Sequence, residues 1–137
     1  MAGLDVKQFV VIHVEKVAEE ADFISRIFNA AAIVVSDKVR MVDTGRFTVR
    51  IEKANSPAEV TRGVQLEVHA NNVNRFAEEV WNRGVKYASR PQNHADGLRR
   101  VAFVSPGDIR ITGVGPLKLD STGAFPAFRP DGTPEPK

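Results

Sequence analysis

The chain has 137 residues, of which 42% are hydrophobic and 26% charged, and its formal net charge is +2. These values are typical of one globular domain, and the interleaved basic and acidic residues argue against a nucleic-acid-binding face. The absence of cysteine excludes disulfides and thiolate chemistry. Since no apolar run approaches the length of a membrane span or the core of a signal peptide, we expect a cytoplasmic protein.

The first half of the chain predicts a strand, a helix, a strand and a hairpin in that order. Residues 9–17 are apolar and β-branched, which is typical of a buried strand. Residues 18–30 carry apolar side chains at helical spacing behind an acidic first turn. The segment Asp43-Thr44-Gly45-Arg46 is a hairpin signal. Further strands are expected at 32–35, 39–42 and 47–53.

The second half repeats this order. Residues 64–68 alternate apolar and polar side chains, as a half-buried strand does. Asn72 is a favoured helix N-cap, an apolar stripe runs from Val73 to Trp81, and Gly84 stands where a glycine often ends a helix. Strands are then expected at 85–90, 98–104 and 109–112, and residues 113–116 are interpreted as a turn.

The two halves, residues 9–53 and 63–115, therefore look like two copies of one βαβββ unit with a period of about 50 residues. We predict an α+β fold and one domain over residues 1–116, with a linker at 54–62. Residues 117–137 are rich in proline and predict an extended or disordered tail. Its large apolar groups, Phe125 and Phe128, either stay free or dock on the body or on a partner subunit.

Strand parity assigns a set of polar side chains to the sheet face opposite the helices. His13 is interpreted in three ways: as a metal ligand, as a hydrogen-bonding group for an organic ligand, or as a residue without function. Arg50 and Arg110 either bind an anion or neutralise acidic neighbours across strands. Arg99 and Arg100 are expected to be solvated charges rather than a lid. The set comprises His13, Glu15, Thr48, Arg50, Glu52, Gln65, Glu67, His69, Asp108, Arg110 and Thr112.

Two segments resemble the vicinal oxygen chelate superfamily, which includes glyoxalase I, extradiol dioxygenases and bleomycin-binding resistance proteins. The first runs from His13-Val14 through Glu20 to Ile27-Phe28. The second, Gly97 to Asp108, looks like the superfamily's Gly-x-Arg…Phe-x-Asp-Pro-Asp-Gly-Asn signature. The resemblance covers residues 9–115. It implies tandem βαβββ modules that form a curved, cup-shaped mixed sheet with helices on the convex face, usually in a homodimer.

Enzymes of this superfamily hold one divalent metal, and the resemblance implies four ligand positions. The first falls on His13, which matches, and the second falls near Glu52. The third, usually His, falls on Gln65. The fourth, usually Glu, falls on Thr112, whose neutral hydroxyl is a poor substitute for a carboxylate.

The leading hypothesis is therefore a small-molecule-binding protein that holds an organic ligand or antibiotic in the cup without a catalytic metal. The expected partners are this small molecule and a second copy of the chain, with no nucleic acid and no membrane. The alternative is a metal-dependent lyase, isomerase or dioxygenase with its metal on His13, Glu52 and Gln65. A third is a scaffold with a vestigial cup. The ligand-binding residues would be His13, Arg50, Glu52, Gln65, Glu67, Arg110 and Thr112.

Overall fold

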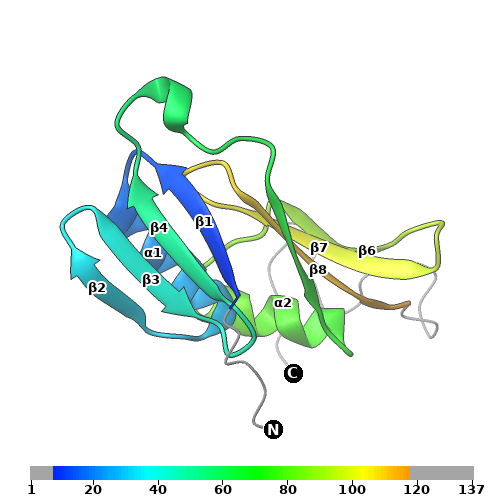
Figure 1. Ribbon diagram of the computed structural model, residues 1–137. Helices are drawn as coiled ribbons and strands as arrows, with labels where there is room; N and C mark the ends of the chain where they lie inside the picture. The colour runs from blue at the N-terminus through cyan, green and yellow to red at the C-terminus, as the bar shows by residue number, and fades with distance from the viewer. Residues whose placement is uncertain (1–7, 118–137) are drawn as a thin grey trace, which may run out of the picture. The chain divides into compact units, whose positions relative to one another are not determined.

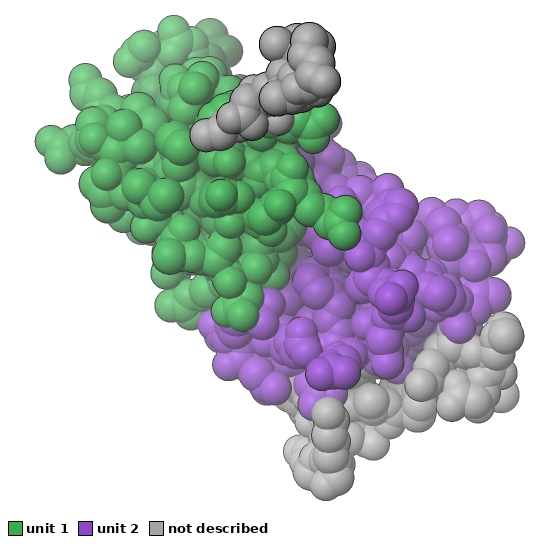
Figure 2. Space-filling model, turned by 60° about the horizontal axis from the view of Figure 1, so that its bottom comes forward, with its two compact units in different colours: residues 1–62 green, residues 63–137 purple. Residues whose placement is uncertain are grey.

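A computed structural model describes residues 8–117 of the chain. The chain divides into two compact units, residues 1–62 and residues 63–137 (Figure 2). Each unit contains one four-stranded sheet and one α-helix in its described part (Figure 1). Neither helix is long and apolar enough to cross a membrane. Phe125 and Phe128 of the predicted tail lie outside the described residues.

Unit 1 begins with a strand and its helix and continues with three antiparallel strands. Its strand order is β1-β4-β3-β2, in which β1 runs parallel to β4 and the other neighbours are antiparallel. A short 3-10 turn at Pro57–Glu59 follows the last strand. The elements are β1 (Phe9–Val14), α1 (Val17–Phe28), β2 (Ala32–Ser36), β3 (Val39–Asp43) and β4 (Thr48–Lys53).

The core of unit 1 lies between α1 and one face of its sheet. The apolar stripe of α1 includes Ala21, Ile24 and Ile27, and all three are fully or almost fully buried. The helix ends at Asn29, whose φ of 52° is left-handed, a conformation that asparagine tolerates better than most residues. Ile12, Val14, Val42, Val49 and Ile51 face the helix from the sheet and are no more than 1% exposed.

Unit 2 repeats this arrangement. Its strand order is β5-β8-β7-β6, with β5 parallel to β8 and the remaining pairs antiparallel. Asn72 caps its helix as predicted, because the Asn72 side chain accepts a hydrogen bond from the backbone N–H of Arg75 at 3.1 Å. The elements are β5 (Gln65–His69), α2 (Val73–Asn82), β6 (Ser89–Asn93), β7 (Leu98–Val104) and β8 (Arg110–Pro116).

Two strand predictions in unit 2 are wrong. The strand expected at 85–90 is β6, which starts at Ser89 and passes through Pro91. Pro91 is tolerated there because β6 is an edge strand. Proline lacks a backbone N–H, and on the outer side of an edge strand no neighbouring strand needs that donor. The turn expected at 113–116 is instead the second half of β8.

The glycines of β8 mark close packing rather than a turn. A Cβ on Gly113 would lie 2.7 Å from the ring of Phe76, which packs edge-to-face on Phe103 with ring centroids 6.0 Å apart. A Cβ on Gly115 would lie 2.0 Å from the carbonyl oxygen of Ala70. Glycine inside a strand is thus required here by the approach of the helix and of the segment before it.

The predicted α+β fold of two βαβββ modules is confirmed. In each unit the helix covers one face of the sheet, and the polar strand residues predicted by parity, other than Glu15 and Asp108, lie on the other. We call this second face the open face of the unit. The joining of the two sheets into one cup stays a prediction.

Candidate functional site

Three predicted site residues meet on the open face of unit 1. His13 on β1 and Glu52 on β4 are cross-strand partners, with His13 Nε2 at 3.5 Å from Glu52 Oε1. Arg50 Nε donates to the other carboxylate oxygen of Glu52 at 2.7 Å. The guanidinium of Arg50 also lies over the ring of Phe9, 5.8 Å from its centroid. Arg50 thus pairs with Glu52 along the same strand, β4, rather than across strands as the neutralising alternative expected.

The backbone of His13 is fixed by the segment that follows β4. The N–H of His13 donates to Thr61 Oγ1 at 2.8 Å, and the His13 carbonyl accepts from the Thr61 N–H at 2.9 Å. The imidazole is thus held on a rigid strand while its side chain stays 38% exposed. The two charged groups of this cluster, Arg50 and Glu52, are bonded to each other. The strongest hydrogen-bonding groups of the cluster are therefore already in use.

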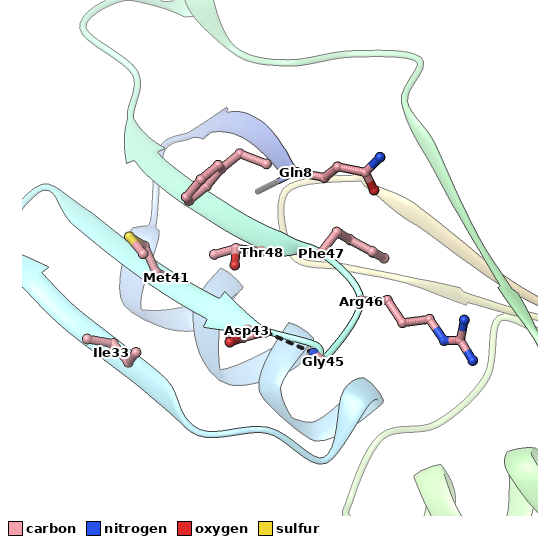
Figure 3. Close-up of a pocket in the computed structure, with 9 residues that line it drawn as sticks. Gln8, Ile33, Met41, Asp43, Gly45, Arg46, Phe47 and Thr48 are labelled. Carbon is pink, nitrogen blue, oxygen red and sulfur yellow. Dashed lines mark hydrogen bonds between the residues drawn. The ribbon is translucent and has the colours of Figure 1, made fainter. Parts of the chain in front are cut away.

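Unit 1 also has a hollow of about 490 Å³ (Figure 3), which Phe9 lines but His13, Arg50 and Glu52 do not. Ile33, Met41 and Thr48 lie on the adjacent strands β2, β3 and β4, and Arg46 extends from the β3–β4 turn. The Asp43 carboxylate accepts from the N–H of Gly45 at 2.9 Å and so shapes that turn. Sites for small molecules occupy roughly 300–1,000 Å³ with mixed apolar and polar walls. The lining residues are Gln8, Phe9, Ile33, Met41, Asp43, Gly45, Arg46, Phe47 and Thr48.

In unit 1, His13 and Glu52 are spaced as two ligands of one metal ion could be. Two ligands of one zinc ion lie about 3.4 Å apart when each bond is about 2.1 Å long, so the separation of His13 and Glu52 suits a pair of ligands. Catalytic zinc centres usually take three protein ligands. Among residues 8–117 no group of three or more His, Cys, Asp or Glu side chains lies close enough to hold an ion. The described His, Asp and Glu side chains of unit 1 therefore do not by themselves complete a zinc centre.

The other four predicted ligand-binding residues lie on the open face of unit 2. Gln65 on β5 is the cross-strand partner of Arg110 on β8, and Glu67 is the partner of Thr112. Glu67 accepts from the ring of His69 at 3.0 Å. Among residues 8–117, Glu67 makes no ion pair with Arg110, and its bonded neighbour is His69, which the i,i+2 spacing along β5 places on the same face.

A hollow of about 210 Å³ lies over this part of unit 2. Thr112 is 3% exposed, and its Oγ1 has no hydrogen-bond partner among the described residues. The side chains of Gln65, Ser89 and Arg110 likewise make no hydrogen bond or ion pair within residues 8–117. The hollow is lined by Gln65, Ser89, His94, Arg100, Val101, Ala102, Arg110 and Thr112.

Arg100 is the one lining residue of this hollow whose charge is firmly paired in the described structure. It donates to the two carboxylate oxygens of Asp96 at 3.0 and 2.6 Å. These bonds lower the pKa of the Asp96 carboxyl from its ordinary value of 3.8 and raise the pKa of Arg100. The positive charge of Arg100 is thus largely neutralised by a neighbour outside the hollow.

Arg99 behaves differently from the solvated charge that the sequence suggested. It is 1% exposed on the helix side of β7, where its guanidinium donates to Asn74 Oδ1 and to Asn93 Oδ1, each at 2.8 Å. Two adjacent arginines look alike in the sequence, but adjacent strand residues point to opposite faces of the sheet, so Arg99 is buried on one face and Arg100 lies on the other. Arg99 therefore has a structural role in joining α2 to β6.

Strand parity failed for one member of the polar set and left others out. Asp108 lies in the turn before β8 with φ 64°, so the alternation does not reach it. Glu15 is exposed just beyond the end of β1. Ser89 and His94 were not assigned to the set, although Ser89 lies within the strand expected at 85–90; His94 follows the end of β6. The hollow of unit 1 was also missed, although Met41 and Asp43 alternate with buried Val42 and so could have been assigned to the open face.

The fold matches solved structures although the sequence matches no family model and no curated protein. A glyoxalase/bleomycin resistance protein/dioxygenase from Nocardioides aligns with a TM-score of 0.69 at 11% identity, over 91% of this chain and 92% of the other. A family enzyme of the same description from Burkholderia phytofirmans PsJN gives a TM-score of 0.65 at 14% identity, over 80% and 98%. A glyoxalase/bleomycin resistance protein from Catenulispora acidiphila gives 0.65 at 13%, over 81% and 98%.

These matches cover both βαβββ units, and they support at the level of fold the resemblance to the vicinal oxygen chelate superfamily. Identities of 11–14% carry the fold alone. What this chain binds has to be argued from its own residues.

Proposed function

We propose that this protein binds a small organic molecule on the open faces of its sheets, without a catalytic metal, and does so as a homodimer. The observation that carries the proposal is the group of uncommitted polar side chains around the hollow of unit 2. Gln65, Arg110 and the buried hydroxyl of Thr112 lack partners among residues 8–117. Of the three, Thr112 is buried, whereas Gln65 and Arg110 are exposed to solvent. Buried polar groups are normally hydrogen-bonded, so the Thr112 hydroxyl favours a ligand that completes it, and Gln65 and Arg110 lie beside it within reach of such a ligand.

The chemistry of the implied metal positions supports the same proposal. Gln65 and Thr112 stand where metal-dependent relatives would place a histidine and a glutamate, and both are neutral oxygen donors. The hollow of unit 1 adds a space of ligand size with apolar walls from Phe9, Ile33 and Met41. Because structural neighbours are described as bleomycin resistance proteins, an antibiotic is one candidate for the organic ligand.

The alternative is a metal-dependent lyase, isomerase or dioxygenase. One observation favours it, namely the separation of 3.5 Å between His13 Nε2 and Glu52 Oε1. Its ion would need a further donor, for which the resemblance offers Gln65. The described His, Asp and Glu side chains do not supply that donor within unit 1.

Elemental analysis of the purified full-length chain distinguishes the two functions. We expect no divalent metal in stoichiometric amount, and the same result for His13→Ala. His69→Ala is the matched control, because its imidazole is 78% exposed and lies outside both hollows. One tightly bound ion per subunit in the natural protein and in His69→Ala, but not in His13→Ala, would reject the proposal in favour of the enzyme.

A further inference from the structure

We propose that the hollow of unit 2 recognises a singly charged carboxylate group of the ligand, held by Arg110 with the Thr112 hydroxyl and the Gln65 amide as further donors. This inference rests on the proposed function and names the chemistry of its ligand. It uses side chains of one unit only.

Arg110 supplies the charge. Its guanidinium lines the hollow and makes no hydrogen bond or ion pair with the other described residues. Guanidinium donors match the two oxygens of a carboxylate in bidentate geometry. Glu67 faces the same side of the sheet as the cross-strand partner of Thr112, but it does not line the hollow and is bonded to His69.

The buried hydroxyl of Thr112 points to a ligand independently of Arg110. Thr112 lies two residues along β8 from Arg110, so both side chains occupy one face of the strand. Its Oγ1 is buried without a partner, which is unfavourable unless something else accepts its hydrogen. A carboxylate oxygen is such an acceptor. Gln65, opposite Arg110 on β5, adds an amide N–H donor.

The count of free charges favours a carboxylate over a phosphate. Two arginines line the hollow, but Arg100 is held by both oxygens of Asp96. Among the described residues this leaves Arg110 as the lining arginine without an ion pair, and one carboxylate can pair with it. The negative charge of Glu67 on the same face acts on Arg100 and disfavours a second negative charge on the ligand. The size of the hollow, about 210 Å³, lies below the usual range for whole ligands, which fits the capture of a head group rather than of an entire molecule.

The test is a titration of the isotopically labelled full-length chain, followed by amide shifts in NMR. The probes are benzoate, the neutral amide benzamide and the doubly charged phenyl phosphate. We expect saturable shifts around Gln65 and Thr112 with benzoate. Benzamide should bind at least about tenfold more weakly, because charge-assisted hydrogen bonds are about twice as strong as neutral ones. Phenyl phosphate should bind no more tightly than benzoate.

Variants separate recognition from folding. Arg110→Gln should weaken benzoate binding by about tenfold or more. Arg110→Lys should bind benzoate more tightly than Arg110→Gln but less tightly than the natural chain, because lysine returns the positive charge without the bidentate donors of a guanidinium. Arg90→Gln is the matched control, because Arg90 is an exposed residue of β6 outside the hollow, and it should change affinity less than about twofold. Asp96→Asn should free Arg100 and raise the affinity for phenyl phosphate more than that for benzoate.

Three results would overturn the inference: equal binding of benzamide and benzoate, tighter binding of phenyl phosphate to the natural chain, or an Arg110→Gln variant that binds benzoate unchanged. Each of these leaves the proposed function standing, because a neutral or doubly charged organic ligand still occupies the protein. An absence of shifts with every probe would overturn the carboxylate site. Only the finding of a stoichiometric metal would overturn the proposed function with it.

Discussion

The hydroxyl of Thr112 gives the sharpest test of the idea that unit 2 is shaped for a ligand rather than for stability. The side chain is 3% exposed and its Oγ1 has no partner in the described structure. A buried hydroxyl without a hydrogen bond costs about 1–3 kcal/mol in proteins. Thr112→Val replaces that hydroxyl with a methyl group of similar shape, so the ligand-free variant should be more stable by about 1–2 kcal/mol.

Urea unfolding followed by the fluorescence of Trp81 measures this change. With a denaturant slope of about 2 kcal/mol/M, the midpoint should rise by about 0.5–1 M. The same substitution should weaken benzoate binding, so stability and affinity move in opposite directions. Thr61→Val is the matched control with the opposite sign. Thr61 Oγ1 accepts from the N–H of His13 at 2.8 Å, and its loss should lower stability by about 1 kcal/mol.

A Thr112→Val variant that is destabilised by about 1 kcal/mol or more would refute this reasoning, because the hydroxyl would then have a favourable partner in the free protein. An unchanged affinity for benzoate would separately show that the hydroxyl does not contact the ligand.

The remaining predictions concern stability and titration. Gly115→Ala should prevent folding or lower the free energy of unfolding by more than about 3 kcal/mol, because its Cβ would lie 2.0 Å from the Ala70 carbonyl oxygen; a melt within a few degrees of the natural chain would contradict the close approach. Arg99→Met should cost about 2–4 kcal/mol in urea unfolding, since Asn74 would lose a buried donor; a neutral result would mean that the guanidinium is dispensable. The Asp96 carboxyl should titrate below 3.8 in the folded chain, so its contribution to stability is complete above that pH and is lost as the pH falls through the lower, folded value; carboxyl NMR checks this, and a pKa above 3.8 would be inconsistent with the ion pair.

Much of the fold follows from local patterns that tertiary packing reinforces. The Asn72 cap, the apolar stripe of α2 and the strand at 98–104 were all predicted because each has a local physical signal. Reliance on local signals also misplaced β6 and the end of β8, because the local signal there is misleading. Pro91 looks like a strand breaker until β6 is known to be an edge strand, and Gly113 and Gly115 look like a turn until their packing partners are known.

The open faces were predictable as sets of residues, but the pairings within them were not. Parity assigned Arg110, Glu67 and Thr112 to one face. It could not tell that Glu67 bonds to His69, or that Arg110 has no ion pair within the part of the chain that the structure describes. Side-chain reach and competition among neighbours decide such pairings, and both depend on coordinates. Arg99 shows this most clearly. It is buried whereas the adjacent Arg100 is not, and only the position of each residue on β7 tells the two apart.

Native mass spectrometry of the full-length chain, purified gently and treated with a chelator, tests the central claim most directly. The account predicts a dimer that retains an organic molecule after chelation and releases it on denaturation. A chain that carries only a divalent ion before chelation, and no organic molecule after it, would contradict the account.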